Sequence, residues 1–301
     1  MKTPPDPIPV VLFAYARPGH LARTLAGLRA DAVPLIYAFA DGARGAADAA
    51  AVAETRALLR GIDWCEVRLT ERTENLGLGR NVLAGASAVA AAHAAFIGWE
   101  DDLLCVPGTY AWLCAALRRY AGDPRVMSVT GWTHPRIAPA APGASPYFDA
   151  RAESWSWGTW ARAWRGMNDE TALEKMAAGE RRGLDPAACG GDLPAQAAAE
   201  AARNLWAARW VYHHLLHDGL CVRPPWSMVE HAGFDALATN APEPCGWAQA
   251  ALRAAPPVPE TWPGPQEDRD ARRRWRASHP AGWRAWWRRV SARVRRLAGR
   301  A

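Results

Sequence analysis

Four short strand-like segments constrain the fold of this chain more than any other feature of its sequence. Three are continuous apolar runs and one alternates, and they lie at residues 9–15, 35–40, 65–69 and 94–99. Stretches with helical periodicity or high alanine content separate them. Strands that alternate with helices and are apolar on both faces predict an α/β fold with a mostly parallel sheet and right-handed crossovers. With 301 residues, 50% of them hydrophobic, the chain can form a large core.

The rest of the chain is less regular. Its pattern predicts a helix, a strand and a loop at residues 112–120, 126–129 and 133–150. A long helix is expected from Ala195 to His217, because Pro194 stands near its first turn. Residues 241–266 are rich in proline, which predicts a linker. The expected organisation is therefore a domain at residues 1–240, this linker, and a basic helical tail at residues 267–301.

The positive charge of the chain is concentrated at its C-terminal end. The net charge is +6, but residues 267–301 hold twelve arginines against three acidic residues, a local charge of 12 − 3 = +9. Residues 1–266 therefore carry 6 − 9 = −3. A nucleic-acid partner is not expected for this larger part.

The N-terminal segment and the cysteines indicate a compartment. The apolar run from Ile8 to Ala16 is too short to span a membrane and lacks a signal-peptide cleavage pattern. Six cysteines occur without a C-x-x-C pair, so zinc-ribbon and redox spacings are absent from the sequence. These features predict a cytoplasmic protein with reduced thiols.

Three polar segments follow predicted strands and are the first candidates for a site. They are Ala16-Arg17-Pro18, Asp41-Gly42 and Glu100-Asp101-Asp102. The carboxyl ends of parallel strands meet at one edge of the sheet, so these segments are expected to converge on one crevice. Three adjacent carboxylates repel one another unless a cation lies among them, which favours a divalent metal site. A solvated turn or the first turn of a helix is the alternative.

Two further segments have properties suited to a nucleotide. Residues 75–81 form a glycine-containing loop before a helix and would bring Arg80 near phosphate, although a plain turn has the same appearance. Asp41 could accept hydrogen bonds from a base or ribose, or it could belong to a simple Asp-Gly turn.

Aromatic residues and one histidine complete the candidate set. Trp155, Trp157 and Trp160 lie close together, and their rings suit the C–H faces of an acceptor sugar, while an aromatic core is the alternative. His231 follows a short apolar stretch and is a candidate late contact to a metal or diphosphate.

The order of these segments resembles bacterial family-2-like GT-A glycosyltransferases, including HlpA-like proteins, and more distantly N-acetylglucosaminyltransferase I. The resemblance covers roughly residues 8–240. It is carried by Val10 to Pro18, Phe39 to Gly42, Asn75 to Asn81, Trp99 to Leu103, Ser128 to Trp132, Ser156 to Trp164 and Cys221 to Pro224.

This resemblance implies a GT-A, Rossmann-like, nucleotide-sugar-binding fold and a Mn²⁺- or Mg²⁺-dependent hexosyl- or N-acetylhexosaminyl-transfer, generally inverting. By position, Asp102 would be the direct metal ligand and Asp101 a contact to the donor's ribose or sugar. Glu100 would shape the base-ribose site, Asp41 would meet the nucleobase, and Ala14, Tyr15 and Arg17 would line it. The acceptor stays open among a sugar, a lipid-linked group, a peptide and a small molecule.

The chain departs from this family at the expected general base. Relatives carry an acid in a W-D-x-x-W or W-D-D-W pattern, whereas the stretch here runs from Asn204 to Trp210 with Ala207-Ala208. Glu200, one helical turn before Asn204, could supply the carboxylate, and so could Asp192 at the helix entrance. Alternatively the acceptor needs little deprotonation, or the reaction retains configuration.

The C-terminal tail has a helical stripe of its own. Trp283, Trp287, Val290, Val294 and Leu297 recur at steps of four and three, with arginines elsewhere around the helix. A basic amphipathic helix suits an anionic bilayer, which predicts peripheral contact with the inner membrane face through residues 283–297. The alternative is a helix packed on the domain with a solvated basic face.

Two other functions fit parts of the same pattern. A noncatalytic nucleotide-sugar-binding protein would explain the missing acid. A sugar-nucleotide nucleotidyltransferase would share the acidic metal ligands, but it usually has a glycine-rich loop with Arg and Lys after the first strand, where this chain has Ala16 to Gly19.

Overall fold

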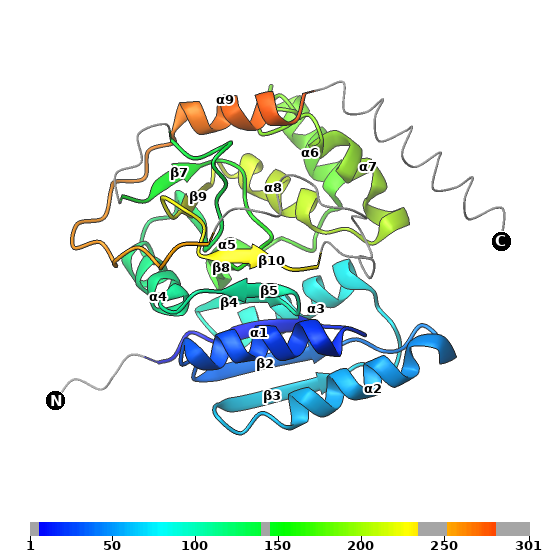
Figure 1. Cartoon of the computed structure of the whole chain (residues 1–301). Helices are drawn as coiled ribbons and strands as arrows, with labels where there is room; N and C mark the ends of the chain where they lie inside the picture. The colour runs from blue at the N-terminus through cyan, green and yellow to red at the C-terminus, as the bar shows by residue number, and fades with distance from the viewer. Residues whose placement is uncertain (1–5, 140–144, 234–251, 281–301) are drawn as a thin grey trace.

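The computed structural model describes residues 6–139, 145–233 and 252–280. An eight-stranded sheet forms its centre, in the order β3-β2-β1-β4-β8-β6-β9-β7 (Figure 1). The strands are β1 Val10–Ala14, β2 Leu35–Ala40, β3 Glu66–Glu71, β4 Ala95–Glu100, β6 Val126–Thr130, β7 Tyr147–Asp149, β8 Trp157–Trp160 and β9 Leu220–Arg223. A separate antiparallel pair joins β5 Leu103–Cys105 to β10 Val229–His231.

Most strands of the sheet run in one direction. Parallel pairing joins β3, β2, β1 and β4, while β8 is antiparallel to both β4 and β6. Strand β9 is parallel to β6, and the edge strand β7 is antiparallel to β9. The prediction of an α/β fold with a mostly parallel sheet is confirmed.

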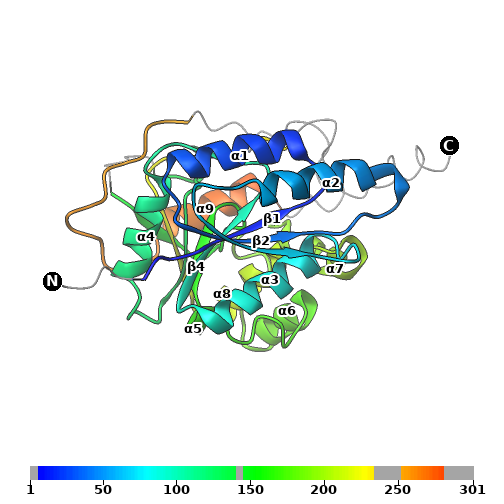
Figure 2. The ribbon, with the colours of Figure 1, turned by 90° about the horizontal axis from the view of Figure 1, so that it is seen from below.

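Helices cover both faces of the sheet (Figure 2). They are α1 Pro18–Ala30, α2 Ala46–Arg60, α3 Leu78–Ala92, α4 Thr109–Arg119, α5 Ala161–Trp164, α6 Ala172–Arg181, α7 Leu193–Arg203, α8 Ala207–Leu216 and α9 Arg269–Ser278. Pro18 stands in the first turn of α1, where its missing N–H has no helical partner to lose.

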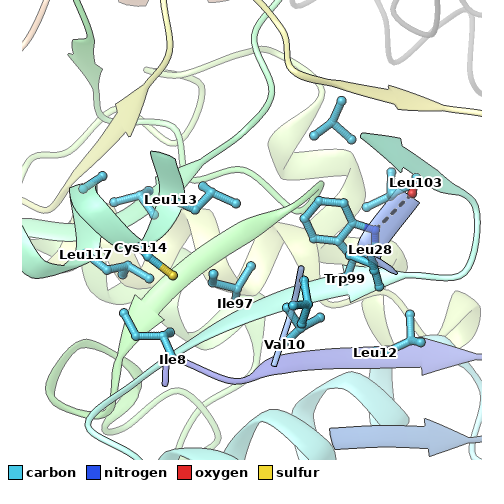
Figure 3. Packing of buried hydrophobic residues seen from close by; sticks show 14 of the residues in the cluster. Ile8, Val10, Leu12, Leu28, Ile97, Trp99, Leu103, Leu113, Cys114 and Leu117 are labelled. Carbon is cyan, nitrogen blue, oxygen red and sulfur yellow. Dashed lines mark hydrogen bonds between the residues drawn. The ribbon is translucent and has the colours of Figure 1, made fainter. Parts of the chain in front are cut away.

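Alternating side chains of the strands divide the core into two layers. From β1, Val10 and Leu12 join the α1 and α4 layer, whereas Val11 and Phe13 join the α3 and α5–α8 layer. Figure 3 shows the first layer, where the Trp99 indole donates a hydrogen bond of 3.0 Å to the Leu103 carbonyl. Burial on both faces explains why the strand sequences are continuous apolar runs.

The predicted long helix from Ala195 to His217 is wrong. It is two helices, α7 and α8, separated at Asn204, whose φ of 50° lies in the left-handed region and ends α7. The Asn204 side chain accepts from the Arg80 backbone N–H at 2.9 Å and donates to the Leu76 carbonyl at 2.6 Å. These tertiary hydrogen bonds oppose the helical periodicity and explain the break.

The chain after residue 251 packs on the domain instead of linking it to a separate tail. Trp262 lies between Trp112 and Tyr120, at ring-centroid distances of 5.6 and 5.8 Å. Helix α9 lies against β7 (Figure 1), and the buried Trp275 indole donates to Asp149 at 3.0 Å. The predicted boundary at residue 240 therefore does not separate 252–280 from the body. The proposed membrane stripe over 283–297 lies outside the described residues.

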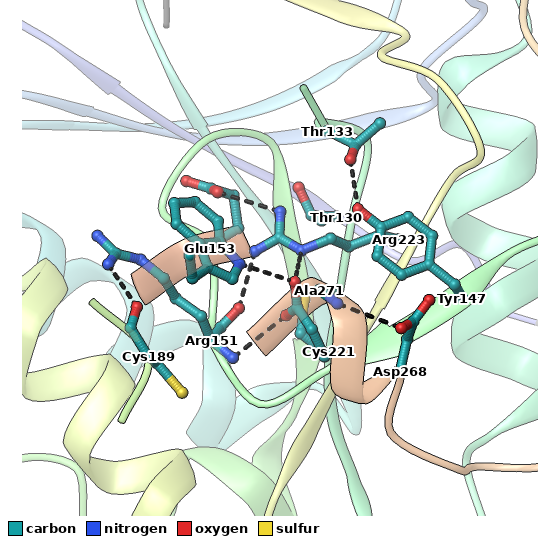
Figure 4. Close-up of polar contacts among 12 residues, drawn as sticks. Thr130, Thr133, Tyr147, Arg151, Glu153, Cys189, Cys221, Arg223, Asp268 and Ala271 are labelled. Carbon is teal, nitrogen blue, oxygen red and sulfur yellow. Dashed lines mark hydrogen bonds and ion pairs between the residues drawn. The ribbon is translucent and has the colours of Figure 1, made fainter. Parts of the chain in front are cut away.

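A buried network of charges fixes this C-terminal part to the sheet (Figure 4). The Arg223 guanidinium, 0% exposed, contacts Asp149 at 2.6 Å and Glu153 at 3.2 Å. Arg151 pairs with Asp192 at 2.8 Å. Each of these three carboxylates therefore has a guanidinium partner.

No helix within the described ranges is both long and apolar enough to cross a bilayer.

Candidate functional site

A cavity of about 280 Å³ opens at the carboxyl ends of β1, β2 and β4. Its walls include Ala14, Tyr15 and Arg17 after β1, Asp41 after β2, and the run from Glu100 to Asp102 after β4. The three segments that the sequence predicted to converge thus surround one space. The parallel pairing of β1 with both β2 and β4 brings them there.

The acidic run forms one corner of this cavity and is tied to the first strand. The Tyr15 backbone N–H donates to Asp101 Oδ2 at 2.8 Å, and the Thr24 hydroxyl donates to the Asp101 carbonyl at 2.8 Å. Arg17 Nη1 lies 2.7 Å from Asp102 Oδ2. Neither Asp101 nor Asp102 is a solvated turn residue, since both are buried.

A possible set of metal ligands, called the cation set below, occurs in this corner: Glu100, Asp102 and His231. Ligand atoms of Glu100, Asp102 and His231 all lie within 4.8 Å of one another. The short β10–β5 pair produces this grouping because it places His231 opposite Leu103, the residue after Asp102. Asp102 Oδ1 is buried without a hydrogen bond, and His231 Nε2 lies 3.5 Å from it. An orphaned carboxylate oxygen beside a carboxylate and an imidazole fits Mn²⁺ or Mg²⁺, with the oxygens as the preferred ligands.

The electrostatics of the corner favour the binding of a cation. Burial, and then the charges of Asp102 and Asp101, raises the pKa of Glu100 well above its usual range. Burial and the Asp102 charge raise the pKa of Asp101 in the same way. Desolvation lowers the pKa of His231, which favours the neutral imidazole that binds metals. A bound cation would stabilise all three carboxylates in their charged forms.

Asp41 has a different role from the predicted contact to a base. Its Oδ1 accepts from the backbone N–H groups of Leu76 at 2.8 Å and Gly42 at 3.0 Å. Its Oδ2 accepts from the Gly77 N–H at 2.8 Å and the Asn75 amide at 3.2 Å. Both oxygens are occupied, so Asp41 positions the loop over 75–77 instead of presenting a free carboxylate to a nucleobase.

The glycines of the 75–81 loop are explained by Asn204. A Cβ at Gly77 or Gly79 would overlap Asn204, and Gly77 has a φ of +72°. The Gly79 N–H donates to the Asn204 carbonyl at 3.0 Å. The loop therefore holds the junction between α7 and α8, and exposed Arg80 does not line the cavity. Gly77, Leu78 and Asn81 of the same segment line the cavity, so the structure keeps this part of the loop at the candidate site and places only Arg80 away from it.

Only one of the three predicted acceptor tryptophans faces the cavity. Trp155 lines it, 4.7 Å between ring centroids from His231. Trp157 is 1% exposed and packs on Trp164 at 5.2 Å, and the Trp160 indole donates to the Leu117 carbonyl. Burial in the two core layers prevents Trp157 and Trp160 from offering a ring face to an acceptor, so the aromatic-core interpretation holds for both.

Both candidate bases are held in ion pairs. Glu200 Oε1 lies 2.6 Å from Arg209 Nε, and Oε2 accepts from the Ala172 N–H at 2.7 Å. Asp192 pairs with Arg151 and accepts from the Gln196 amide at 2.7 Å. Neither lines the cavity, whose α7–α8 wall consists of Gln196 and Leu205 to Ala207. The structure therefore does not bring either carboxylate to the place where a base would act.

Several lining residues were not named as candidates from the sequence. Arg44 lies over the Tyr15 ring at 5.1 Å, and Gln196, Ser154 and Trp206 form other parts of the wall. Arg44 could have been found from its position three residues after Asp41, near a strand end. Gln196 and Trp206 line the wall because of how α7 and α8 pack against the sheet.

Comparisons with known proteins find glycosyltransferases at low similarity. No family model and no curated protein matches the chain. A mannosyltransferase from Pyrobaculum calidifontis, solved with GDP-Man and Mn²⁺, has 15% identity and a TM-score of 0.36, over 54% of this chain and 48% of that one. Mouse xyloside xylosyltransferase 1 in its apo form has 10% identity and a TM-score of 0.30, over 54% and 69%. The chain thus spans about half the length of the first structure, and likenesses of this size define no family.

Proposed function

We propose that the protein is a divalent-metal-dependent glycosyltransferase that uses a nucleotide-diphosphate sugar. The observation that carries this proposal is the group of buried Asp102 with partly buried Glu100 and His231 beside Arg17, at the carboxyl end of a parallel strand. Such a group would hold Mn²⁺ or Mg²⁺, which neutralises charge on a departing diphosphate. The order of motifs that resembles GT-A glycosyltransferases supports the same function.

The residues of the chain would divide the work along the cavity. Arg17 and Arg44 line it and provide positive charge for an anionic donor. The Tyr15 backbone N–H holds the Asp101 carboxylate, so this group is in place before a ligand binds. Trp155 and the wall from Leu205 to Ala207 provide apolar surface on the side assigned to the acceptor.

A nucleotide-sugar-binding protein without transferase activity is the second candidate. The carboxylates that line the cavity in the described part of the chain are Asp41 and the acidic run, and Asp41 is fully occupied. With Glu200 and Asp192 held in ion pairs, the α7–α8 wall offers no free carboxylate as a base. Such a protein would bind the donor and release no product.

One assay separates the two candidates. The full chain is incubated with Mn²⁺ and a panel of nucleotide sugars, and release of nucleoside diphosphate is measured alongside calorimetric binding. We expect diphosphate release that disappears on chelation and in Asp102→Asn. Donor binding without release, at any metal concentration, would favour the binding protein. Neither binding nor release with any donor would overturn both.

A further inference from the structure

Arg17 occupies the carboxylate that the cation set requires. It is the residue that precedes α1, and its guanidinium meets Asp102 Oδ2 at 2.7 Å. The Arg17 side chain is 14% exposed and that of Asp102 is 6% exposed. An enclosed charge-assisted pair of this kind is much stronger than a surface ion pair, so removing Arg17 from Asp102 has a cost.

Backbone groups enclose the pair further. The Ala232 N–H donates to the Asp102 carbonyl at 2.8 Å. A side chain at Gly233 would overlap both Asp102 Oδ2 and the Arg17 guanidinium. The two residues after β10, which places His231 beside Asp102, thus lie directly against the Arg17–Asp102 pair. Water has little room to separate the two charges.

The two oxygens of Asp102 have different surroundings. Oδ2 is bound by Arg17, whereas Oδ1 is buried without a hydrogen bond on the side of His231. A cation on this carboxylate and a guanidinium on the same carboxylate repel each other. Each must therefore weaken the binding of the other.

We infer that Arg17 is a positioning residue that competes with the divalent cation for Asp102 and is released from it by an anionic diphosphate. This inference rests on the proposed function. Metal alone then binds weakly, because it must displace or tolerate the guanidinium. A diphosphate attracts Arg17 and removes that opposition, so metal and diphosphate bind cooperatively. The arrangement keeps the affinity of Glu100, Asp102 and His231 for a cation low until the donor binds.

The test measures binding of Mn²⁺ alone by electron paramagnetic resonance, without any nucleotide. Arg17→Met should bind Mn²⁺ about tenfold more tightly than the wild type, since the competing charge is gone. Arg44→Met is the matched control. It removes the same charge from the same cavity without contacting Asp102, and it should tighten Mn²⁺ binding by less than about threefold. Arg17→Lys keeps the charge and should stay near the wild type.

Inorganic pyrophosphate provides the second measurement. It should strengthen Mn²⁺ binding to the wild type more than to Arg17→Met, beyond the effect of free Mn²⁺–pyrophosphate complexes. Equal tightening in Arg17→Met and Arg44→Met, or weaker Mn²⁺ binding in Arg17→Met, would overturn the inference. Arg17→Gln serves if circular dichroism shows that Arg17→Met is unfolded. If no sugar donor is bound or cleaved, the proposed function is wrong, whereas the comparison of Mn²⁺ binding among the variants still tests the role of Arg17.

Discussion

The protein buries charged side chains in two places, which differ in whether opposite charges compensate for the burial. In the Arg223 network, which Figure 4 shows, burial by itself would lower the pKa of Arg223, yet the Asp149 carboxylate raises it. Arg151 likewise lowers the pKa of Asp192 against the effect of its burial. In the acidic corner, burial and neighbouring carboxylates instead raise the pKa values of Glu100 and Asp101.

This difference separates a structural cluster from a candidate site. In the network, opposite charges compensate for burial, and the result fastens β7, β9 and α9 together. In the corner, burial and repulsion are only partly offset by Arg17, and Asp102 Oδ1 lacks a hydrogen bond. A site that binds a cation must keep such an imbalance, because a corner already neutralised would gain little from the ion.

The largest effect is expected from breaking the network. Arg223→Met should lower the free energy of unfolding by about 3–5 kcal/mol, because Asp149 and Glu153 would be left buried without their cation. Urea denaturation measures this change. Arg125→Met is the control, since Arg125 forms a surface pair with Asp123 and its loss should cost no more than about 1 kcal/mol. Equal losses in both variants would contradict the assigned role of the network.

In the acidic corner, a substitution should reduce activity strongly and change stability little, which is the opposite of the result expected for the network. Asp102→Asn should reduce metal-dependent diphosphate release by about 10²–10³-fold, because the cation loses a charged ligand. Stability should change by less than about 1 kcal/mol, since the lost pairing with Arg17 is offset by relief of repulsion. Rates come from the donor panel and stability from urea denaturation. Large destabilisation with unaltered activity would place Asp102 among the structural charges.

A substitution of Glu200 tests whether this predicted general base is a structural charge, like those of the network, or a catalytic one. Glu200→Gln should cost about 1–3 kcal/mol of stability, because Arg209 loses its partner and the Ala172 N–H keeps a weaker acceptor. Turnover should change by less than about threefold. A fall of about 10²–10⁴-fold in turnover, with the fold intact, would instead identify Glu200 as the general base.

The smallest expected effect concerns buried histidines. Burial lowers the pKa of His214 from its usual 6.5 to about 3. Its Nδ1 must donate to the Trp210 carbonyl, so Nε2 of the neutral ring accepts from the Ser128 hydroxyl. A lowered histidine pKa means that stability is complete above pH 6.5 and falls as the pH drops toward 3.

The pH effect can be measured on one residue. At pH 5.5, His214 should contribute a loss of about 1.4 kcal/mol relative to pH 7.5, since only the unfolded chain binds the proton. Urea denaturation of the wild type and His214→Gln at the two pH values gives this difference. Between pH 7.5 and 8.5 the two proteins should show the same pH dependence. An equal loss of stability in both proteins at pH 5.5 would remove His214 as its cause.

The sequence by itself determined the parallel strands β1 to β4 and the place of the corner. Runs such as Val10–Ala14 and Leu35–Ala40 are apolar on both faces, and a chain buries such runs only in a sheet covered on both sides. Because parallel strands end at one edge, the shared location of Arg17, Asp41 and Glu100 to Asp102 followed from the predicted parallel direction of the strands. His231 was also named from its sequence neighbourhood.

Only the tertiary structure decided what each polar group does. Asp41, Glu200 and Asp192 are carboxylates in suitable places along the chain, but other residues already bind them, and for Asp41 and Asp192 these partners include Leu76 and Arg151, which are distant in sequence. Asn204 breaks a helix that local periodicity favours, because its hydrogen bonds reach residues 76 to 80. A side chain's role depends on whether its hydrogen-bonding capacity is already used, and long-range contacts determine that.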